Sequence, residues 1–235
     1  MATDVLAPPE AAAHRPIASP WHTLLVVAVQ GFLTFRGKIH ADQMRAMVNP
    51  DRIGIYERTI FFEWLVFALV IVGVWLSGSS LYTVLGERWR SLRQFFSDIG
   101  IGVLFLIAAL TMDSILGPHL RGNAGDHAAQ FILPHGGVEM AWWMVLSLSA
   151  GICEETLFRG YFQRQFMALT RSVPAGIILS AGAFGAAHGY QGLRPAVQIG
   201  LLGAMAGGLA HWRKSVRPGM IAHTLQDVLG GVVNH

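Results

Sequence analysis

Long apolar stretches alternate with short polar connections along most of the chain. Nearly uncharged stretches of this length are typical of helices that cross a membrane. The pattern therefore predicts an all-α fold, a polytopic transmembrane helical bundle of about six to eight membrane helices. The predicted helices occupy residues 60–76, 99–116, 138–166, 174–189, 196–212 and 220–233.

The first sixty residues follow this pattern less closely. Residues 1–20 are rich in Ala and Pro and lack the basic start of a signal peptide, which predicts a disordered tail. Residues 21–35 are apolar but short, so they form either a span lengthened by its flanks or an interfacial helix. Residues 36–58 are interpreted as a polar connection with a turn at their Asn-Pro-Asp sequence. We therefore divide the chain into three parts. Residues 1–20 form a tail, residues 21–137 form N-terminal membrane helices with their loops, and residues 138–235 form a C-terminal helical core.

Composition supports a membrane setting. Charged residues make up 13% of the chain, against about 25% in ordinary soluble domains. Hydrophobic residues reach 53%, and the mean hydropathy is +0.46. With 235 residues the chain has room for one bundle and for no sizeable soluble domain. Its net charge of +3 is too small to indicate a nucleic-acid partner.

The basic residues of the connections predict an orientation. Lys and Arg are more frequent in cytoplasmic loops, and the later connections alternate between three and one of them. Those with three are 78–98, 159–171 and 213–217, and those with one are 117–137 and 190–194. This alternation places the C-terminal side of the 138–166 helix in the cytoplasm. Residues 36–58 hold five basic residues and oppose that orientation.

Two adjacent carboxylates stand near the middle of the predicted helix 138–166. Residues 154–159 read Glu-Glu-Thr-Leu-Phe-Arg and follow an apolar run. An unpaired charge at membrane depth costs about 2.5–3.5 kcal/mol even on the mildest insertion scale, so these groups need a use. Glu155 and Arg159 are four residues apart and can pair on one helix face, while Glu154 points about 100° away. Glu154 is therefore the carboxylate left for chemistry.

Further polar residues lie on the next apolar segments. His188 ends a segment rich in Gly and Ala, and His223 and Asp227 lie four residues apart on one helix face. Taken singly, each has a structural interpretation, as a packing histidine or a His–Asp pair. Together with Glu154 they lie on segments joined by short connections. A carboxylate beside imidazoles can activate water for hydrolysis and stabilise an oxyanion.

Other candidates are weaker. Cys153 is the only cysteine, and neighbouring carboxylates disfavour its thiolate, which indicates a buried hydrophobe rather than a nucleophile. Three histidines in 117–137 have no compact metal-ligand spacing. Asp113 stands near the end of its apolar stretch and is interpreted as interfacial. The zincin, serine-hydrolase and P-loop motifs are absent. Gly-x-x-x-Gly spacings at 185–189 and 203–207 predict closely packed helices.

Three ordered motifs give the sequence a specific resemblance. Glu-Glu-x-x-x-Arg at 154–159, Phe-x-x-x-His at 184–188 and His-x-x-x-Asp at 223–227 resemble the motif set of the CPBP intramembrane proteases. That family includes type II CAAX prenyl endopeptidases and bacteriocin-immunity (Abi) proteins. The resemblance covers about 142–233. It implies a site within the membrane that cleaves a peptide bond of a peptide or protein substrate near the membrane surface.

The resemblance also implies roles for the motif residues. By position, Glu154 would be the general base, assisted by His188, and Glu155 and Arg159 would orient and brace it. His223 and the residue at 227 would stabilise the oxyanion or hold a metal.

A common version of the family has Asn where this chain has Asp227. A carboxylate cannot donate to an oxyanion unless it is protonated, so orienting His223 or ligating a metal suits Asp227 better. His188, His223 and Asp227 with a water would satisfy a catalytic zinc and leave a glutamate as base. In the metal-free alternative, Glu154 and His188 activate water directly.

Two other function classes stay open at the level of the sequence. A binding or immunity protein could keep the family fold and sequester a partner. A proton-coupled or ion-coupled transporter could use the Glu, His and Asp side chains as a relay, although no pair of equivalent broken helices is visible. In each case we expect a multi-pass protein in contact with lipid, in the cell (plasma) membrane. No motif indicates the substrate sequence or an oligomeric state.

Overall fold

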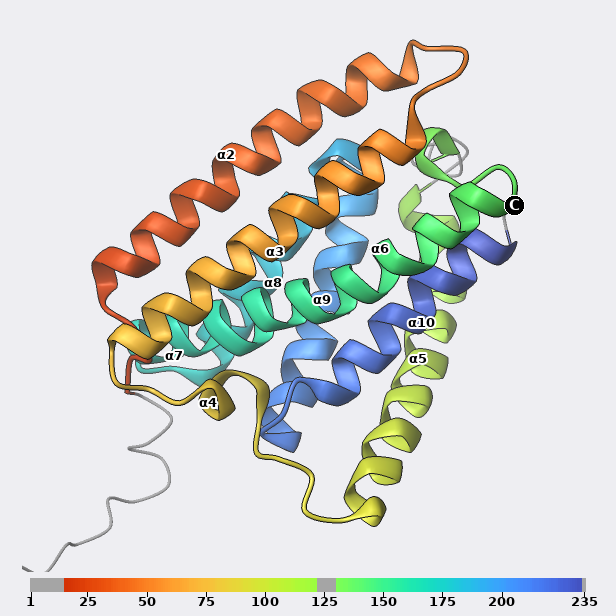
Figure 1. The fold of residues 1–235 in the computed structure, drawn as a ribbon. Helices are drawn as coiled ribbons and strands as arrows, with labels where there is room; N and C mark the ends of the chain where they lie inside the picture. Colours follow the sequence, from red (N-terminus) through yellow and green to blue (C-terminus); the bar gives the residue numbers. More distant parts are fainter. Residues whose placement is uncertain (1–14, 122–129, 234–235) are drawn as a thin grey trace, which may run out of the picture.

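The computed structural model describes residues 15–121 and 130–233, and this part of the chain contains helices and no strand (Figure 1). The prediction of an all-α bundle is confirmed. The elements in chain order are α2 (Pro20–Arg45), α3 (Arg52–Leu76), α4 (Leu81–Leu85), α5 (Leu92–Arg121), η2 (Gln130–Ile132), α6 (Gly137–Glu155), η3 (Thr156–Phe162), α7 (Gln163–Thr170), α8 (Val173–Ala187), η4 (Gly189–Gln191), α9 (Leu193–Arg213) and α10 (Arg217–Val233).

The interpretation of residues 36–58 as a connection is wrong over most of its length. Helix α2 continues to Arg45 and α3 begins at Arg52, so the connection is 46–51 and contains the predicted turn. The polar end of α2 stays helical because Asp42 pairs along the helix with Lys38 at 3.3 Å and with Arg45 at 2.9 Å. Asp51 caps α3 by accepting the Gly54 N–H at 3.0 Å.

The last residues of the predicted tail are anchored to α7. Ile17 and Ala18 are buried, and Gln165 of α7 accepts the Ile17 N–H at 2.8 Å and donates to the Ala18 carbonyl at 2.9 Å. His22 of α2 also contacts η3, because its Nδ1 lies 2.6 Å from the Tyr161 hydroxyl. Residues 1–14 of the predicted tail lie outside the described residues.

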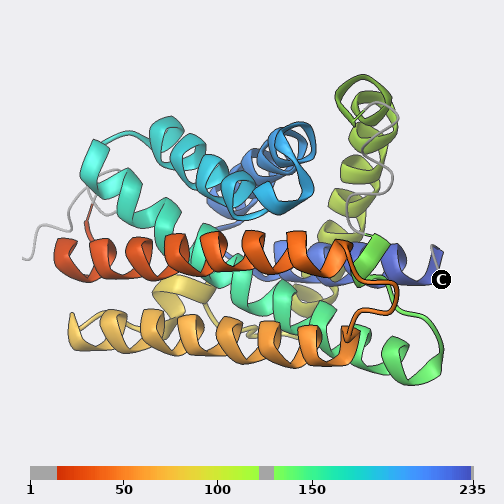
Figure 2. The ribbon, with the colours of Figure 1, turned by 90° about the horizontal axis from the view of Figure 1, so that it is seen from above.

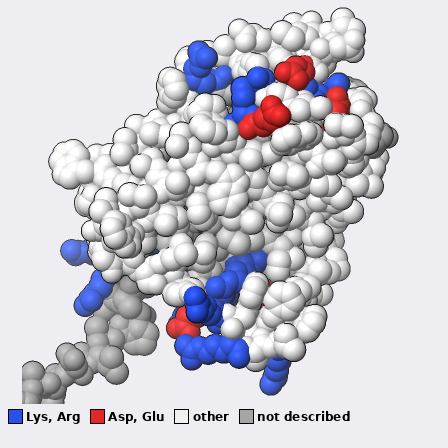
Figure 3. Space-filling view, in the orientation of Figure 1, with Lys and Arg blue, Asp and Glu red and all other residues white. Residues whose placement is uncertain are grey.

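Three of the described helices are long and apolar enough to cross a membrane: Arg52–Leu76, Leu92–His119 and Leu193–Arg213. Val173–Ala187 is a shorter apolar helix. They correspond to four of the predicted stretches. The charged side chains gather at two ends of the molecule, and a broad belt without charge separates these ends (Figure 3). This distribution is expected for a bundle whose middle lies in hydrocarbon.

Contacts between connections define the two ends. At one end, residues near Leu85 meet the α9–α10 connection, because the Val216 N–H bonds to the Leu85 carbonyl and Arg217 donates to the carbonyls of Gly86 and Glu87. At the other end, Arg45 donates to the Tyr190 carbonyl at 2.5 Å. The basic residues of 36–58 thus lie at the opposite end from those of 78–98 and 213–217. The two groups therefore predict opposite orientations in the membrane in the folded chain as well.

The predicted helix 138–166 is continuous but changes its winding. Helix α6 passes into the π-helical segment η3 and then into α7. In η3 the Gln163 N–H bonds to the Phe158 carbonyl, five residues back, and Ser180 of α8 donates to the same carbonyl at 2.6 Å. Such π-helical turns are frequent at functional sites. Here the turn lies directly after the two glutamates.

Small residues let the helices around α6 approach closely. A Cβ added at Gly151 of α6 would lie 2.1 Å from the Thr224 Oγ1 of α10, and one at Gly185 of α8 would lie 2.5 Å from the Ala196 carbonyl of α9. The predicted close packing is thus present at the first Gly-x-x-x-Gly spacing through Gly185. Seen from above, α2 and α3 run side by side, with α8 and α9 beyond α2 (Figure 2).

Candidate active site

Of the two glutamates at the end of α6, Glu155 pairs with Arg159, as the spacing predicts. Arg159 NH1 donates to Glu155 Oε1 at 2.8 Å, and both side chains are about 3% exposed. The guanidinium also lies 4.1 Å from the centre of the Phe184 ring, which adds a cation–π contact. Glu155 Oε2 rests against the backbone of α10, where a Cβ at Gly219 would approach it to 2.7 Å. Glu155 is therefore a held carboxylate.

Glu154 lies between the two motif histidines. Its Oε2 is 4.0 Å from His188 Nε2 and 3.9 Å from His223 Nε2. This oxygen is buried and has no hydrogen-bond partner among the described residues. A buried oxygen without a donor carries a free-energy cost, so its place between two imidazoles indicates a site for a water or a substrate group.

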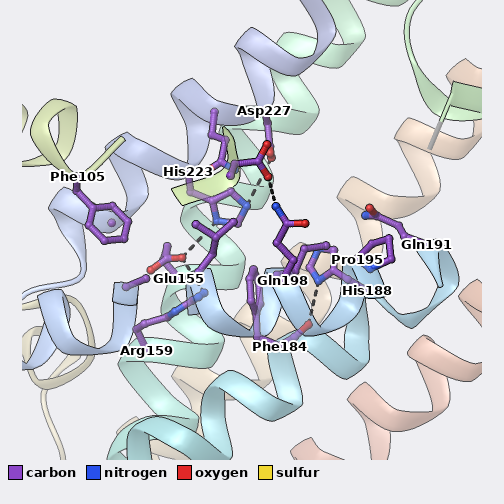
Figure 4. A pocket seen from close by; sticks show the side chains of 16 residues that line it. Phe105, Glu155, Arg159, Phe184, His188, Gln191, Pro195, Gln198, His223 and Asp227 are labelled. Atoms are coloured by element: carbon purple, nitrogen blue, oxygen red, sulfur yellow. Dashed lines mark hydrogen bonds and ion pairs between the residues drawn. The ribbon is translucent and has the colours of Figure 1, made fainter. Parts of the chain in front are cut away.

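His223 is surrounded by carboxylates from two helices. Its Nδ1 lies 3.3 Å from Glu155 Oε1, and its Nε2 lies 3.5 Å from Asp227 Oδ2 (Figure 4). In its protonated form the ring can donate from both nitrogens. Trp143 of α6 fixes this part of α10 by donating its indole N–H to the Asp227 carbonyl at 2.9 Å. The ring is thus oriented by α6 as well as by its own helix.

His188 has a defined tautomer in its neutral form. Its Nδ1 lies 2.9 Å from the carbonyl of Phe184 in α8 (Figure 4). A carbonyl only accepts, so Nδ1 carries the proton and Nε2 presents a lone pair toward Glu154. His188 follows the last residue of α8, where the Phe-x-x-x-His spacing makes this local bond possible. The motif spacing therefore fixes which nitrogen faces the acid.

A cavity of about 280 Å³ lies beside these residues. Glu155, Arg159, His188, His223 and Asp227 line it together with residues of α5 and α9, whereas Glu154 does not line it. Glu154 instead borders the two histidines that do. All six predicted site residues are thus brought together, and five of them line the cavity. The site joins α6, η3, α8 and α10 within the bundle (Figure 4).

Sequence reasoning missed three polar residues near the site. Asp113 of α5, interpreted as interfacial, lines the cavity and accepts a hydrogen bond from Gln198 of α9. Glu63 of α3 accepts a hydrogen bond from Ser149 of α6 at 2.6 Å. Two of the three are acids in apolar helices, and intramembrane acids usually face the bundle interior. That signal was present for Glu63 and Asp113, whereas Gln198 carries no charge to mark it.

The donor set for the expected metal is present but is not arranged as a ligand group. Within residues 15–121 and 130–233, no three His, Cys, Asp or Glu side chains are placed so that they could hold a metal ion together. A zinc ion at His188, His223 and Asp227 would therefore need these side chains to move.

Comparison with known families agrees with this geometry. Residues 136–229 match the family model described as type II CAAX prenyl endopeptidase Rce1-like, so the predicted resemblance is confirmed over that region. No curated protein and no solved structure matches the chain. The match over these residues and the apolar helices fit a multi-pass integral membrane protein.

Proposed function

We propose, from the Rce1-like character of residues 136–229, that the chain is an intramembrane endopeptidase in which Glu154 activates water. The observation that carries the proposal is the buried Glu154 Oε2, which has no hydrogen-bond partner among the described residues and lies within 4.0 Å of both motif histidines. A base for a hydrolytic water must be near the reacting atoms and must not be occupied by another partner. Glu154 meets both conditions, while Glu155 is bound to Arg159.

The proposed reaction is addition of water to a peptide carbonyl. Glu154 takes a proton from the water as the oxygen attacks the carbonyl carbon, and the C–N bond breaks when the leaving nitrogen receives that proton. His188 presents its Nε2 lone pair on the same side and orients the water. One water is consumed, and a carboxylic acid and an amine are formed.

The oxyanion of the tetrahedral intermediate needs a donor, and we assign this role to His223. Its Nε2 faces both Glu154 and Asp227, and its Nδ1 is held by Glu155. Donors that are oriented before the reaction stabilise developing charge without reorganisation. Asp227, which cannot donate when ionised, then serves to hold His223 rather than to bind the oxyanion. Arg159 acts through Glu155 and is a positioning residue.

The substrate we propose is a protein or peptide whose cleaved bond lies near the membrane surface, and prenylated C-terminal CAAX sequences are the best-known substrates of the family. The test compares new peptide termini in membranes that contain wild-type chain or Glu154→Gln at equal levels of folded protein. Cleavages that disappear with Glu154→Gln would support the proposal. Removal of a general base is expected to slow the reaction by about 10²–10⁴-fold.

A matched control keeps the comparison specific. Glu139→Gln changes an acid at the other end of α6, where Glu139 accepts the His135 N–H and lies 3.9 Å from Arg52. We expect its cleavage pattern to equal that of the wild type. Identical patterns for wild type and Glu154→Gln, with a cellular phenotype that survives the substitution, would overturn the protease proposal and favour a binding or immunity protein.

A zinc ion at His188, His223 and Asp227 stays a prediction. When bound, it would polarise the substrate carbonyl or lower the pKa of a water. The test is metal analysis of the purified, active protein, followed by chelation and readdition of zinc. Stoichiometric zinc whose removal abolishes cleavage and whose return restores it would confirm the ion. Full cleavage by protein without bound metal would contradict it.

A further inference from the structure

Gln198 is a buried amide that lines the cavity and whose oxygen accepts no hydrogen bond from the described residues. It lies on α9 and is 2% exposed. Its Nε2 donates to Asp113 Oδ1 of α5, while its Oε1 is buried and has no hydrogen-bond partner among the described residues. Both residues line the cavity that also holds His188 and His223. An acceptor is therefore present inside the site and is not used by the motif residues.

Asp113 decides which way this amide faces. An ionised carboxylate only accepts hydrogen bonds, so the amide nitrogen of Gln198 must point to it and the amide oxygen must point away. In the close view, the Gln198 oxygen points to the side of the cavity where His188, Pro195 and Gln191 lie (Figure 4). Turning the amide over would bring two acceptor oxygens together. Asp113 thus keeps Oε1 turned toward the side of His188.

The kind of ligand follows from the vacant atom. An amide oxygen needs a donor, and the N–H groups of a peptide backbone need acceptors when they leave water. Next to this oxygen are the groups proposed to hydrolyse a peptide bond. A substrate chain that places its cleaved bond between Glu154 and His223 brings its neighbouring N–H groups into the same cavity.

We propose that Gln198 Oε1 accepts an N–H of the substrate backbone next to the cleaved bond, and that Asp113 is the positioning residue that holds the amide for it. This inference rests on the proposed endopeptidase function. Neither residue belongs to the three motifs, and Asp113 lies outside the region matched by the family model. The region before residue 136 therefore contributes to substrate binding.

The test removes the substrate N–H and the Gln198 acceptor separately and together. The substrate is a peptide that spans a cleavage site found by mapping new termini. It is compared with two ester analogues, each of which replaces one backbone N–H by oxygen, on one side or the other of the cleaved bond. For wild-type protein, one ester is expected to lower kcat/KM about five- to ten-fold, as the loss of one hydrogen bond does. For Gln198→Met, kcat/KM for the peptide is expected to fall by a similar factor. The ester should then be cleaved with the same kcat/KM as the peptide, because the acceptor for its missing N–H is gone.

The split between kcat and KM separates binding from a general loss of structure. A hydrogen bond made equally in the bound substrate and in the transition state changes KM and leaves kcat. We expect this pattern for Gln198→Met. Since Gln198→Met removes a donor from Asp113, the double variant Asp113→Asn/Gln198→Met serves as a second test and is expected to show the same lack of ester sensitivity.

Gln163→Met is the matched control. Gln163 is also buried, and it donates to the Gly207 carbonyl at 3.0 Å while its Oε1 has no hydrogen-bond partner among the described residues. It does not line the cavity. We expect Gln163→Met to lose stability and to keep the ester sensitivity of the wild type.

The outcomes are distinct for the two levels of the proposal. If wild type cleaves the peptide and Gln198→Met retains the full ester effect, Gln198 does not accept the substrate N–H and the inference is wrong, while the protease function stands. If no ester affects wild type, a water rather than the substrate occupies the acceptor, and the inference is again wrong. If wild type cleaves no peptide at all, the proposed function fails and takes the inference with it.

Discussion

The helices before residue 136 and those after it differ in what they bury. In the most apolar windows of α3 and α5, 22% and 17% of residues are buried, compared with 33% in α9. A smaller share of the earlier helices is thus buried inside the bundle. The later helices carry all three motifs and line the cavity together with α5. This difference indicates that the candidate site is built mainly from the second region, with the first region packed around it.

The two regions are nevertheless joined by hydrogen bonds of one type. Ser149 of α6 donates to Glu63 of α3 at 2.6 Å, and Gln198 of α9 donates to Asp113 of α5. In each case the acid belongs to the first region and the neutral donor to the second. The first region therefore does more than cover the candidate site, because it supplies acids that orient polar side chains of the second region.

The largest expected effect concerns the buried ion pair of the second region. Arg159→Met leaves Glu155 as a buried carboxylate without its guanidinium, which typically destabilises a protein by about 3–5 kcal/mol. The denaturant midpoint of the purified protein in detergent should fall accordingly, and cleavage should be lost. Arg159→Lys keeps a charge and is expected to recover part of the stability. Unchanged unfolding of Arg159→Met would show that the pair does not hold the site together.

The next effect concerns the spacing of α6 and α10. A Cβ at Gly151 would lie 2.1 Å from Thr224 Oγ1 and 3.0 Å from the Met220 carbonyl, so Gly151→Ala should push the helices apart. A shift of about 1 Å between catalytic groups can cost about 100-fold in rate. Steady-state cleavage measures this loss. Gly100→Ala of α5, where a Cβ meets nothing within 4 Å, is the control from the first region and should leave activity unchanged.

A smaller effect is expected at the hydrogen bond between the regions. Ser149→Ala removes the donor to Glu63, and interhelical hydrogen bonds in membrane proteins contribute about 0.6–1.7 kcal/mol. Ser147→Ala is the matched control, because the buried Ser147 hydroxyl donates at 2.8 Å to the Trp143 carbonyl of its own helix. Equilibrium unfolding of the two variants measures the difference. Equal losses would contradict a specific tie between α3 and α6.

The smallest effect is expected at an ion pair of the first region. Lys38 and Asp42 lie 3.3 Å apart with side chains 56% and 53% exposed. Exposed pairs of this kind contribute about 0–1 kcal/mol. Lys38→Met should therefore unfold within about 1 kcal/mol of the wild type and cleave at the same rate. A loss as large as that of Arg159→Met would remove the distinction between the two regions.

Helices were predicted correctly where apolar residues dominate the sequence. The prediction was wrong where a helix is polar. Residues 36–45 were assigned to a connection because they are polar, yet they continue α2, since ion pairs along a helix stabilise an exposed polar end. The motif residues met as predicted, because short connections bring α6, α8 and α10 together. The contact between Asp113 and Gln198 could not be read, because it joins helices 85 positions apart with no pattern linking them.

The π-helical turn was likewise not predicted, because no residue in 156–162 is restricted to it. It depends on tertiary contacts, among them the Ser180 hydroxyl that donates to the Phe158 carbonyl. Local preferences in these residues fit an ordinary α-helix equally well. The pattern of apolar residues therefore predicts one long helix over 138–166 but not the π-helical winding inside it.

The π-helical turn decides how the chain would respond to a change in its length. Such a turn holds one residue more than an α-helical turn, so deleting one residue other than Arg159 within Thr156–Phe162 would let an ordinary α-helical turn close with little rotation of the helix after it. Gln165 would then still face Ile17 and Ala18, which it now binds. A single-codon deletion at position 163 or 164 of α7, which has no such spare residue, would instead turn Gln165 by about 100° and release Ile17 and Ala18 from it.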